Sequence, residues 1–394
     1  MPWMECTAMG QKHEFIEEWL SGAYTVTELC RGFDISRPTA YKYIQKWKEM
    51  GDKGLNELGR TPHFIHNKTT PEIEEAFCAW RRREPRFGAE KILLKLKEDG
   101  YSEKELPALS TGNLILKRNG FVKQKRRFRR VVPAHPIFDP KAPNEVWSAD
   151  FKGKFMMGNR EYCYPLTIAD SYSRYVFAAK GMYRPTFDGC QRVFDEVFRE
   201  FGLPKQIHTD NGSPFGCVQA MSRLSRLAVW FMELGIEPVY SDPGHPEQNG
   251  RHERMHRELN AEAVRPPGYD LRVQQRKLNA FMRKYNFTRP HAALGLKYPA
   301  KVHESSIKRY TGKIEPWEYE KDMVIRYVCR NGAIRWGHSY WVGVSTTLAE
   351  KHVGLQEVGN GIWRIYFRNK YLGHFDERER RIYDNEGRKK RNLV

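Results

Sequence analysis

The sequence predicts an α/β multidomain fold with an all-α N-terminal region of helix-turn-helix units, a mixed-sheet α/β core and a small all-β barrel at the C-terminus. Three observations predict it. Apolar residues repeat at helical spacing up to about residue 120, strand and helix patterns alternate over 144–305, and short aromatic strands with NG and GN turns fill 318–378. At 394 residues, the chain is also too long for one ordinary domain.

Charge and cysteine usage narrow the class of protein. Lys+Arg 67 against Asp+Glu 48 gives a net charge of +19, and the commonest partner of such a positive field is a polyanion. None of the seven cysteines forms a CxxC pair, so a zinc knuckle or redox motif is not expected, and an odd number suits reduced thiols. No apolar run reaches the roughly 18 residues of a membrane span and no signal-peptide core is visible, so we expect a soluble, intracellular protein without a membrane partner.

Residues 1–60 are predicted to form a first helix-turn-helix domain. Three short helical patterns fill 13–50, and the third starts at Ser36, a good N-cap, and stops at Gly51. A basic helix after a tight turn is the geometry that enters the major groove of DNA, although a plain three-helix packing unit would show the same pattern. The candidate DNA contacts on the outward face are Arg37, Thr39, Tyr41, Lys42 and Lys46, opposite the inward-facing Ala40, Ile44 and Trp47.

Residues 68–130 are predicted to form a second helix-turn-helix domain. Three further helical patterns occur there, the last capped by Ser110 or Thr111. Residues 81–130 contain 16 Lys/Arg against 6 Asp/Glu, so phosphate contact is favoured over a merely solvated face. The candidate contacts in the closing run KQKRRFRR are Arg126, Arg127, Arg129 and Arg130. Four prolines in 131–143 then predict a semi-rigid linker.

The core, 144–305, is predicted to be a mixed sheet with helices packed on it and a further helix at its end. Strand patterns cover 144–155, 162–170, 174–183, 205–212 and 236–242, and helical patterns cover 187–202, 222–235 and 245–263. Beyond the core, we expect the β-barrel at 318–378, whose tryptophans are more often core residues than DNA-stacking platforms, and a basic tail at 379–394.

Acidic residues in the core are candidates for phosphodiester chemistry, which uses divalent cations about 3.5–4 Å apart. Asp150 lies within a strand pattern and Asp210 lies where another strand ends, so the two can occupy adjacent strands. Mg²⁺ prefers oxygen ligands, and a few carboxylates with the substrate's phosphate suffice. A third acid must come from the helix at 245–263, which holds four glutamates: Glu247, Glu253, Glu258 and Glu262.

Because of its geometry, this helix can direct only one of its four glutamates toward a given point. At about 100° per residue, Glu258 lies about 140° and Glu262 about 180° from Glu253. Periodicity favours Glu253, although a solvated helical Glu is the usual case, and Glu247 is the second choice. The residues that share the face of Glu253 are small or polar: Asn249, Gly250, His256, Arg257 and Asn260. Two apolar residues, Met255 and Leu259, point toward a core.

Four motifs taken together are similar to a known family. VWSADF, IHTDNGSPF, GHPEQNGRHERMHRELN and YNFTRPHAALGLKYPA resemble the DDE transposase and retroviral-integrase superfamily, and more narrowly bacterial insertion-sequence transposases with an integrase-type core, over residues 13–305. The resemblance implies an RNase H-like core in which Asp150, Asp210 and Glu253 are the catalytic, metal-binding triad for two Mg²⁺ or Mn²⁺ ions. The 42 residues between Asp210 and Glu253 exceed the family's usual spacing, and the surplus lies around GCVQAMSRLSR.

The resemblance also implies a function. We expect a transposase that binds the terminal inverted repeats of its element, cleaves its 3′ ends and joins them to target DNA, as a homodimer or larger assembly in the bacterial cytoplasm at the nucleoid. The alternatives are an inert DNA-binding regulator of the element and an RNase H-like nuclease. Candidate residues tracking DNA near the metals are Gln248, Asn249, Arg251 and Arg254, although Asn249 and Gly250 can equally shape the turn. Asp170 is expected in a turn, and the role of His291 in the RPH motif does not follow from the residues.

Overall fold

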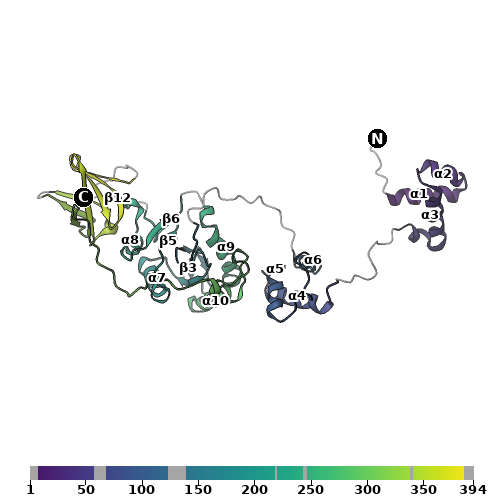
Figure 1. Ribbon diagram of the computed structural model, residues 1–394, viewed down its shortest axis with the longest axis horizontal. Coiled ribbons are helices and arrows are strands. Elements are labelled where there is room, and N and C mark those ends of the chain that lie inside the picture. Colours follow the sequence, from purple (N-terminus) through teal and green to yellow (C-terminus); the bar gives the residue numbers. More distant parts are fainter. Residues whose placement is uncertain are drawn as a thin grey trace. The chain divides into compact units, whose positions relative to one another are not determined.

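The computed structural model describes residues 8–56, 68–122, 139–217, 220–242, 246–337 and 340–385 (Figure 1). The chain divides into two compact units. One consists of the described residues up to Ala76 together with Glu103–Pro107, and the other of Phe77–Ser102 and the described residues from Ala108 onward.

The first unit contains a three-helix bundle with its own core. Its helices are α1 (Ala8–Ser21), α2 (Val26–Gly32) and α3 (Arg37–Met50), followed by the 3₁₀ turn η1 (Gly51–Leu55). The Ser36 side chain accepts a hydrogen bond from the Thr39 N–H, and Gly51 ends α3 with a φ of 62°, so both predicted boundaries are confirmed. The buried residues of the bundle include Phe15, Ile16, Leu29, Ala40, Ile44 and Leu55.

Three more helices follow, α4 (Pro71–Arg83), α5 (Ala89–Glu98) and α6 (Leu109–Arg118). The predicted cap at Ser110 or Thr111 is wrong, because α6 begins at Leu109 after Ala108, whose side chain caps nothing. Close packing explains the register: a Cβ added at Gly112 would lie 2.9 Å from Cζ of Phe77, so this turn of α6 lies directly against α4.

The core sheet confirms the predicted mixed α/β architecture. Its strands are β1 (Val146–Phe151), β2 (Phe155–Met156), β3 (Tyr162–Asp170), β4 (Val176–Met182), β5 (Gln206–Thr209) and β6 (Glu237–Tyr240). The order is β4–β3–β1–β5–β6, with β2 beside the start of β3. β3 is antiparallel to β1 and β4, whereas β1, β5 and β6 are parallel. Parallel β1 and β5 therefore end at the same edge.

Helices cover this sheet. α7 (Phe187–Phe201) and α8 (Arg226–Glu233) share one buried cluster with the strands, which includes Trp147 and Ile207. α9 (Gly250–Leu259) and α10 (Leu271–Arg283) share another with β3 and β4, and Met255 and Leu259 are buried in it as predicted. The remaining turns are η3 (Pro246–Asn249), η4 (Asn260–Val264), η5 (Lys284–Thr288), η6 (Ala292–Leu294) and α11 (Pro299–Val302), of which η4 and η5 are π-helical.

The C-terminal region is all-β, but the predicted closed barrel is wrong. Its strands are β7 (Val324–Tyr327), β8 (Ala333–Trp336), β9 (Tyr340–Gly343), β10 (His352–Gly359), β11 (Ile362–Phe367), β12 (Lys370–Asp376) and β13 (Arg381–Asp384), with a 3₁₀ turn η7 (Thr346–Leu348). They form an open sheet ordered β13–β12–β11–β10–β7 and a separate β8–β9 pair. The ladder does not close because β7 and β13 are its opposite edges. β13 also occupies part of the predicted tail, since Ile382 is 1% exposed.

The surplus residues between Asp210 and Glu253 join the core to this sheet. They include the 3₁₀ turn η2 (Met221–Arg223), and Gly216 forms a bridge to Leu224. The Ser222 hydroxyl donates to the Leu372 carbonyl at 3.0 Å, and Met221 and Leu224 are buried among the C-terminal strands and α8. The extra length therefore supports a domain contact.

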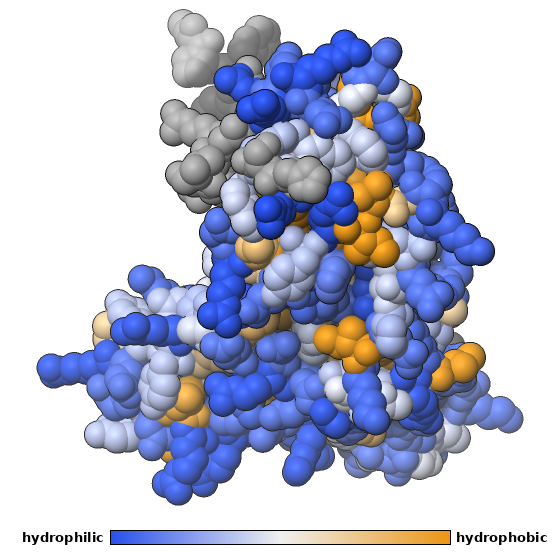
Figure 2. Space-filling view, turned by 90° about the vertical axis from the view of Figure 1, so that its left-hand side faces the viewer, coloured by the Kyte–Doolittle hydropathy of each residue, from blue (hydrophilic) through white to orange (hydrophobic). Residues whose placement is uncertain are grey.

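Most of the surface shown in Figure 2 is hydrophilic, and hydrophobic residues form small separate groups on it. Within the part of the chain that the structure describes, no helix is both long and apolar enough to cross a membrane.

Candidate active site

Two of the predicted acids meet at the edge where β1 and β5 end. Val146 pairs with Gln206 and Ser148 with His208, so the same register continued by two residues places Asp150 opposite Asp210. Neighbouring strands lie about 4.8 Å apart. Asp210 follows the last residue of β5, and its Oδ1 accepts a hydrogen bond from the Gly212 N–H at 3.1 Å, which fixes the turn after the strand.

Helix α9 brings the third acid to the same region. Asn249, directly before α9, donates from Nδ2 to Oδ2 of Asp150 at 3.1 Å and so joins the helix start to β1. Glu253 is exposed in the first turn of α9. Burial first, then the charge of Asp210 and, more weakly, that of Glu253 raise the pKa of Asp150 to about 7, although hydrogen bonds from Phe151 and Asn249 oppose the rise. The three carboxylates therefore share one electrostatic neighbourhood.

This donor set fits a hard divalent cation in chemical type. Three carboxylates supply oxygen ligands, and their mutual repulsion is the kind that a bound cation relieves. Among the described residues, however, no group of three or more His, Cys, Asp or Glu side chains is arranged to hold a metal ion. The carboxylates would therefore have to turn toward a cation, and the substrate's phosphate would complete its ligands.

A buried chain of hydrogen-bonded side chains lies beneath Asp150, and it was not predicted from the sequence. His252 contacts the Ser148 hydroxyl through Nδ1 at 2.9 Å and the Thr167 hydroxyl through Nε2 at 2.6 Å. Thr167 contacts Nε2 of His256 at 2.7 Å and donates to the Asp150 carbonyl at 2.9 Å. Nδ1 of His256 is 3.7 Å from Oδ2 of Asp150.

One proton arrangement satisfies this chain. Because the Thr167 proton goes to the Asp150 carbonyl, its oxygen accepts from Nε2–H of both histidines, and Nδ1 of His252 accepts from Ser148. Burial lowers the pKa of His256 to about 3 and the pKa of His252 well below its usual value, so both rings are neutral in this arrangement. His256 was expected on the open polar face, yet it is 8% exposed. The sequence signal that could have indicated this burial is the i,i+4 spacing of His252 and His256, which places both on one side of the helix next to buried Met255.

The candidate DNA contacts near the acids have different surroundings. The Gln248 amide exchanges two hydrogen bonds with Asp242, each 2.8 Å long, and so joins η3 to the end of the β6 segment. Arg251 and Arg254 are both exposed, and Arg251 donates to the Ser171 carbonyl at 3.3 Å and lies 3.8 Å from Asp139.

In the first unit, Arg37, Tyr41 and Lys42 are exposed, whereas Thr39 and Lys46 are half-buried. Arg37 donates to the Thr27 hydroxyl at 3.0 Å, and the Thr39 hydroxyl lies 2.8 Å from that of Ser36. The four arginines of the KQKRRFRR run, Arg126, Arg127, Arg129 and Arg130, lie outside the described residues.

Asp170 was expected in a turn, but it is the buried last residue of β3, directly before the turn. Its carboxylate accepts from the Ser173 N–H at 2.7 Å, the Ser173 hydroxyl at 2.6 Å and the Asn144 N–H at 3.1 Å. Burial raises its pKa, and these donors oppose the rise. Asp170 therefore holds the turn and the start of the core together.

Comparison with known proteins agrees with this architecture. The Integrase core domain family matches residues 140–246 and again 234–299, and the Helix-turn-helix domain family matches residues 11–62. These matches and the insertion-element relatives below support a member of the DDE transposase and retroviral-integrase superfamily. The resemblance expected from the four motifs is thereby confirmed.

Similar proteins of this superfamily come from bacterial insertion elements. An uncharacterised 39.2 kDa protein of IS476 from Xanthomonas euvesicatoria is 27% identical over 45% of this chain and 50% of its own length. An uncharacterised 31.7 kDa protein of IS407 from Burkholderia multivorans is 26% identical over 62% of this chain and 86% of its own length. Among solved structures, the catalytic core of HTLV-2 integrase with magnesium covers 42% of this chain and 100% of its own, with 17% identity and a TM-score of 0.33.

Proposed function

We propose that the chain is the transposase of a bacterial insertion sequence, a polynucleotidyl transferase that cleaves the 3′ ends of its element and joins them to target DNA. The observation that supports it is the juxtaposition of Asp150 with Asp210 and Glu253 within an integrase core, where burial and two like charges raise the pKa of the Asp150 carboxyl to about 7. A helix-turn-helix match and insertion-element relatives accompany it.

Asp150, Asp210 and Glu253 would hold two Mg²⁺ or Mn²⁺ ions, which activate the attacking oxygen and stabilise the leaving oxygen of a phosphodiester. Asn249 orients the Asp150 carboxylate through Oδ2. The Thr167 hydroxyl fixes the backbone of the same residue from the other side. Asp150 must lose its proton to act as a ligand, and its pKa near 7 makes that loss possible at neutral pH.

Recognition of the inverted repeats is assigned to the first unit. The exposed cations Arg37 and Lys42 lie in α3, the last helix of its helix-turn-helix match, and would lie against the DNA backbone. Thr39, Tyr41 and Lys46 share this helix, and the run around Arg126, Arg127, Arg129 and Arg130 would add phosphate contacts. Two element ends are joined in one reaction, so a homodimer or larger assembly on DNA is part of the proposal.

The test uses labelled duplexes carrying the element's end sequence, with Mg²⁺ or Mn²⁺ and the full chain. Specific nicking at the 3′ end followed by joining to a second duplex is the expected result. Asp150→Asn, Asp210→Asn and Glu253→Gln should each abolish both steps while end binding stays near wild type.

Two other functions make different predictions. An inert regulator would bind ends and never cut them in either metal. An RNase H-like nuclease would cut RNA–DNA hybrids and ignore end sequence, since hybrids are recognised by shape. The helix-turn-helix match favours the transposase over the nuclease.

A further inference from the structure

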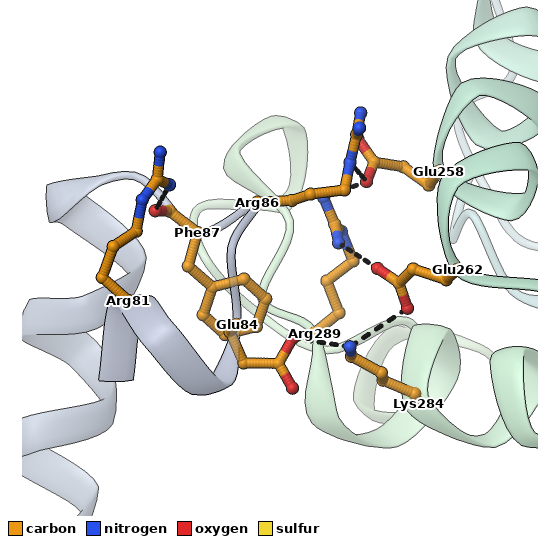
Figure 3. Close-up of polar contacts among 8 residues, drawn as sticks. All are labelled: Arg81, Glu84, Arg86, Phe87, Glu258, Glu262, Lys284 and Arg289. Carbon is orange, nitrogen blue, oxygen red and sulfur yellow. Dashed lines mark hydrogen bonds and ion pairs between the residues drawn. The ribbon is translucent and has the colours of Figure 1, made fainter. Parts of the chain in front are cut away.

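Two other glutamates of the α9–η4 segment are not solvated. Glu258 and Glu262 expose 15% and 17% of their side chains and point toward the α4–α5 connection and η5 (Figure 3). Five residues of helix separate Glu253 from Glu258, which is about 140° of rotation. The back of the helix is therefore occupied by a different set of charges.

The RPH motif supplies the centre of this set. Arg289 is 5% exposed, and its guanidinium forms an ion pair with Glu258 at 2.7 Å and donates a hydrogen bond to Glu262 at 3.2 Å. Its planar group also lies over the Phe87 ring, 5.7 Å from the ring centre. One buried cation thus binds two carboxylates on successive turns of α9 and η4.

The α4–α5 connection approaches the same carboxylates from the other side. Arg86 forms two hydrogen bonds to Glu258, of which the one from Nη2 is 3.0 Å long. Lys284 joins Glu262 at 3.1 Å and Glu84 at 2.5 Å. Burial raises the pKa of Glu258, but the hydrogen bond from Arg86 and the nearby cations lower it overall, so the carboxylate is charged at neutral pH.

A second contact anchors α5 to the segment after the RPH motif. The Tyr298 hydroxyl donates to Glu98 and accepts from Lys95 at 2.8 Å, and Lys95 is also 2.9 Å from Glu98. Glu262 and Lys284 each lie in a π-helical turn, η4 and η5. Such turns often occur at functional sites.

We infer that Arg289 and Arg86 are positioning residues that clamp the back of α9 to the α4–α5 connection and so fix Glu253 relative to Asp150. This inference rests on the proposed function for its effect on catalysis. Since a misplacement of about 1 Å can cost roughly a hundredfold in rate, a loose α9 is sufficient to impair the reaction. The RPH motif thereby acquires a role without touching substrate.

The test compares Arg289→Lys, Arg86→Met and the control Lys205→Met in the full chain. Lysine keeps the charge but cannot bind two carboxylates with one planar fork. Lys205 forms an exposed 3.3 Å pair with Glu145 and is the matched loss of a surface cation. Turnover at saturating end DNA, end-binding affinity and amide hydrogen exchange of α9 are measured below the melting temperature.

We expect Arg289→Lys to lower turnover about tenfold or more, with end binding within about twofold. Arg86→Met should lower it about three- to fivefold, because its pair is part-exposed. Amides of α9 should exchange faster in both variants and not in Lys205→Met. Unchanged turnover and exchange, or weaker end binding alone, would overturn the inference.

Two remaining outcomes are also decisive. If Arg289→Lys fails to fold, Arg86→Met alone decides by the same measurements. If the wild type processes no end DNA with either metal, the proposed function fails, and α9 exchange then decides whether the clamp exists.

Discussion

The two faces of helix α9 carry glutamates in opposite electrostatic surroundings. On one face, Glu253 is exposed and its charge adds to those of Asp150 and Asp210, and among the described residues Glu253 forms no ion pair. On the other, Glu258 and, in the following turn η4, Glu262 are half-buried and form ion pairs with Arg86, Arg289 and Lys284. The difference arises from the residues that surround each glutamate and not from the helix itself. A carboxylate whose charge the fold leaves uncompensated is available to a ligand.

The sharpest way to break this comparison is to neutralise one glutamate on each face. Glu253→Gln should reduce strand transfer by about 10³-fold or more, since losing a metal ligand costs several kcal/mol and each 1.36 kcal/mol is about tenfold. Glu258→Gln should reduce turnover about tenfold and lower the melting temperature, because Arg289 stays buried with one partner lost. Strand-transfer assays and thermal melts check both, and equal activity losses would erase the distinction.

The buried hydrogen bonds beneath Asp150 test how strongly the interior of the protein supports the acidic face of α9. Thr167→Val removes a hydroxyl that joins His252, His256 and the Asp150 carbonyl while keeping the side chain's shape. We expect about 2–3 kcal/mol lower stability toward denaturant, since several buried polar groups lose their partner. Thr167→Ser is the control. A decrease in the free energy of unfolding below about 0.5 kcal/mol would mean that these buried hydrogen bonds contribute little to stability.

The pKa of Asp150 predicts a dependence of stability on pH in the absence of metal. Folding raises this pKa from 3.8 to about 7, so the carboxyl stabilises the folded state fully below pH 3.8 and loses that contribution as pH rises through 7. From about pH 5.5 to about pH 8.5 the loss is at most about 2 kcal/mol, or a few degrees of melting temperature.

Melting scans in EDTA should show this decline in the wild type beyond that of Asp150→Asn, and Mg²⁺ should reverse it at high pH. The variant is needed as reference because burial also shifts the pKa values of neighbouring groups, among them His256 and Asp170. Parallel curves for the two proteins would contradict the assigned charge coupling.

The smallest effects concern cations that the fold leaves exposed, in contrast to Arg289. Lys42→Ala or Arg37→Ala should weaken binding to end DNA and to random duplex alike, and each should reduce the slope of log affinity against log salt by about 0.9. Filter binding over a salt series measures this. An unchanged slope in both variants would remove α3 from the DNA interface.

Sequence reasoning located what depends on periodicity and local caps. The bundle of α1–α3, with its boundaries at Ser36 and Gly51, follows from side-chain capping and glycine's access to positive φ. The strands that carry Asp150 and lead to Asp210 follow from apolar patterns, whereas helical rotation only favoured Glu253 and the family resemblance selected it. These are short-range properties, so the residues themselves encode them.

Long-range packing decided the rest. The start of α6 depends on Gly112 against Phe77, and the open C-terminal sheet depends on which strand edges meet, neither of which has a local signal. Likewise, His256 was expected in a groove because its neighbours on that face are polar, yet the partner that buries it, Thr167, is 89 residues away. Arg289 and Glu258 are joined in the same way across the chain.

The turn at Met221–Leu224 limits how this chain can be divided. Met221 and Leu224 insert among the C-terminal strands together with residues of α8, so the catalytic domain and the C-terminal sheet complete one shared interior. A shortened chain ending before β7 would expose that apolar surface to water and invite aggregation. Evolution therefore cannot exchange or discard the C-terminal sheet as a free module without also rebuilding the segment that follows Asp210.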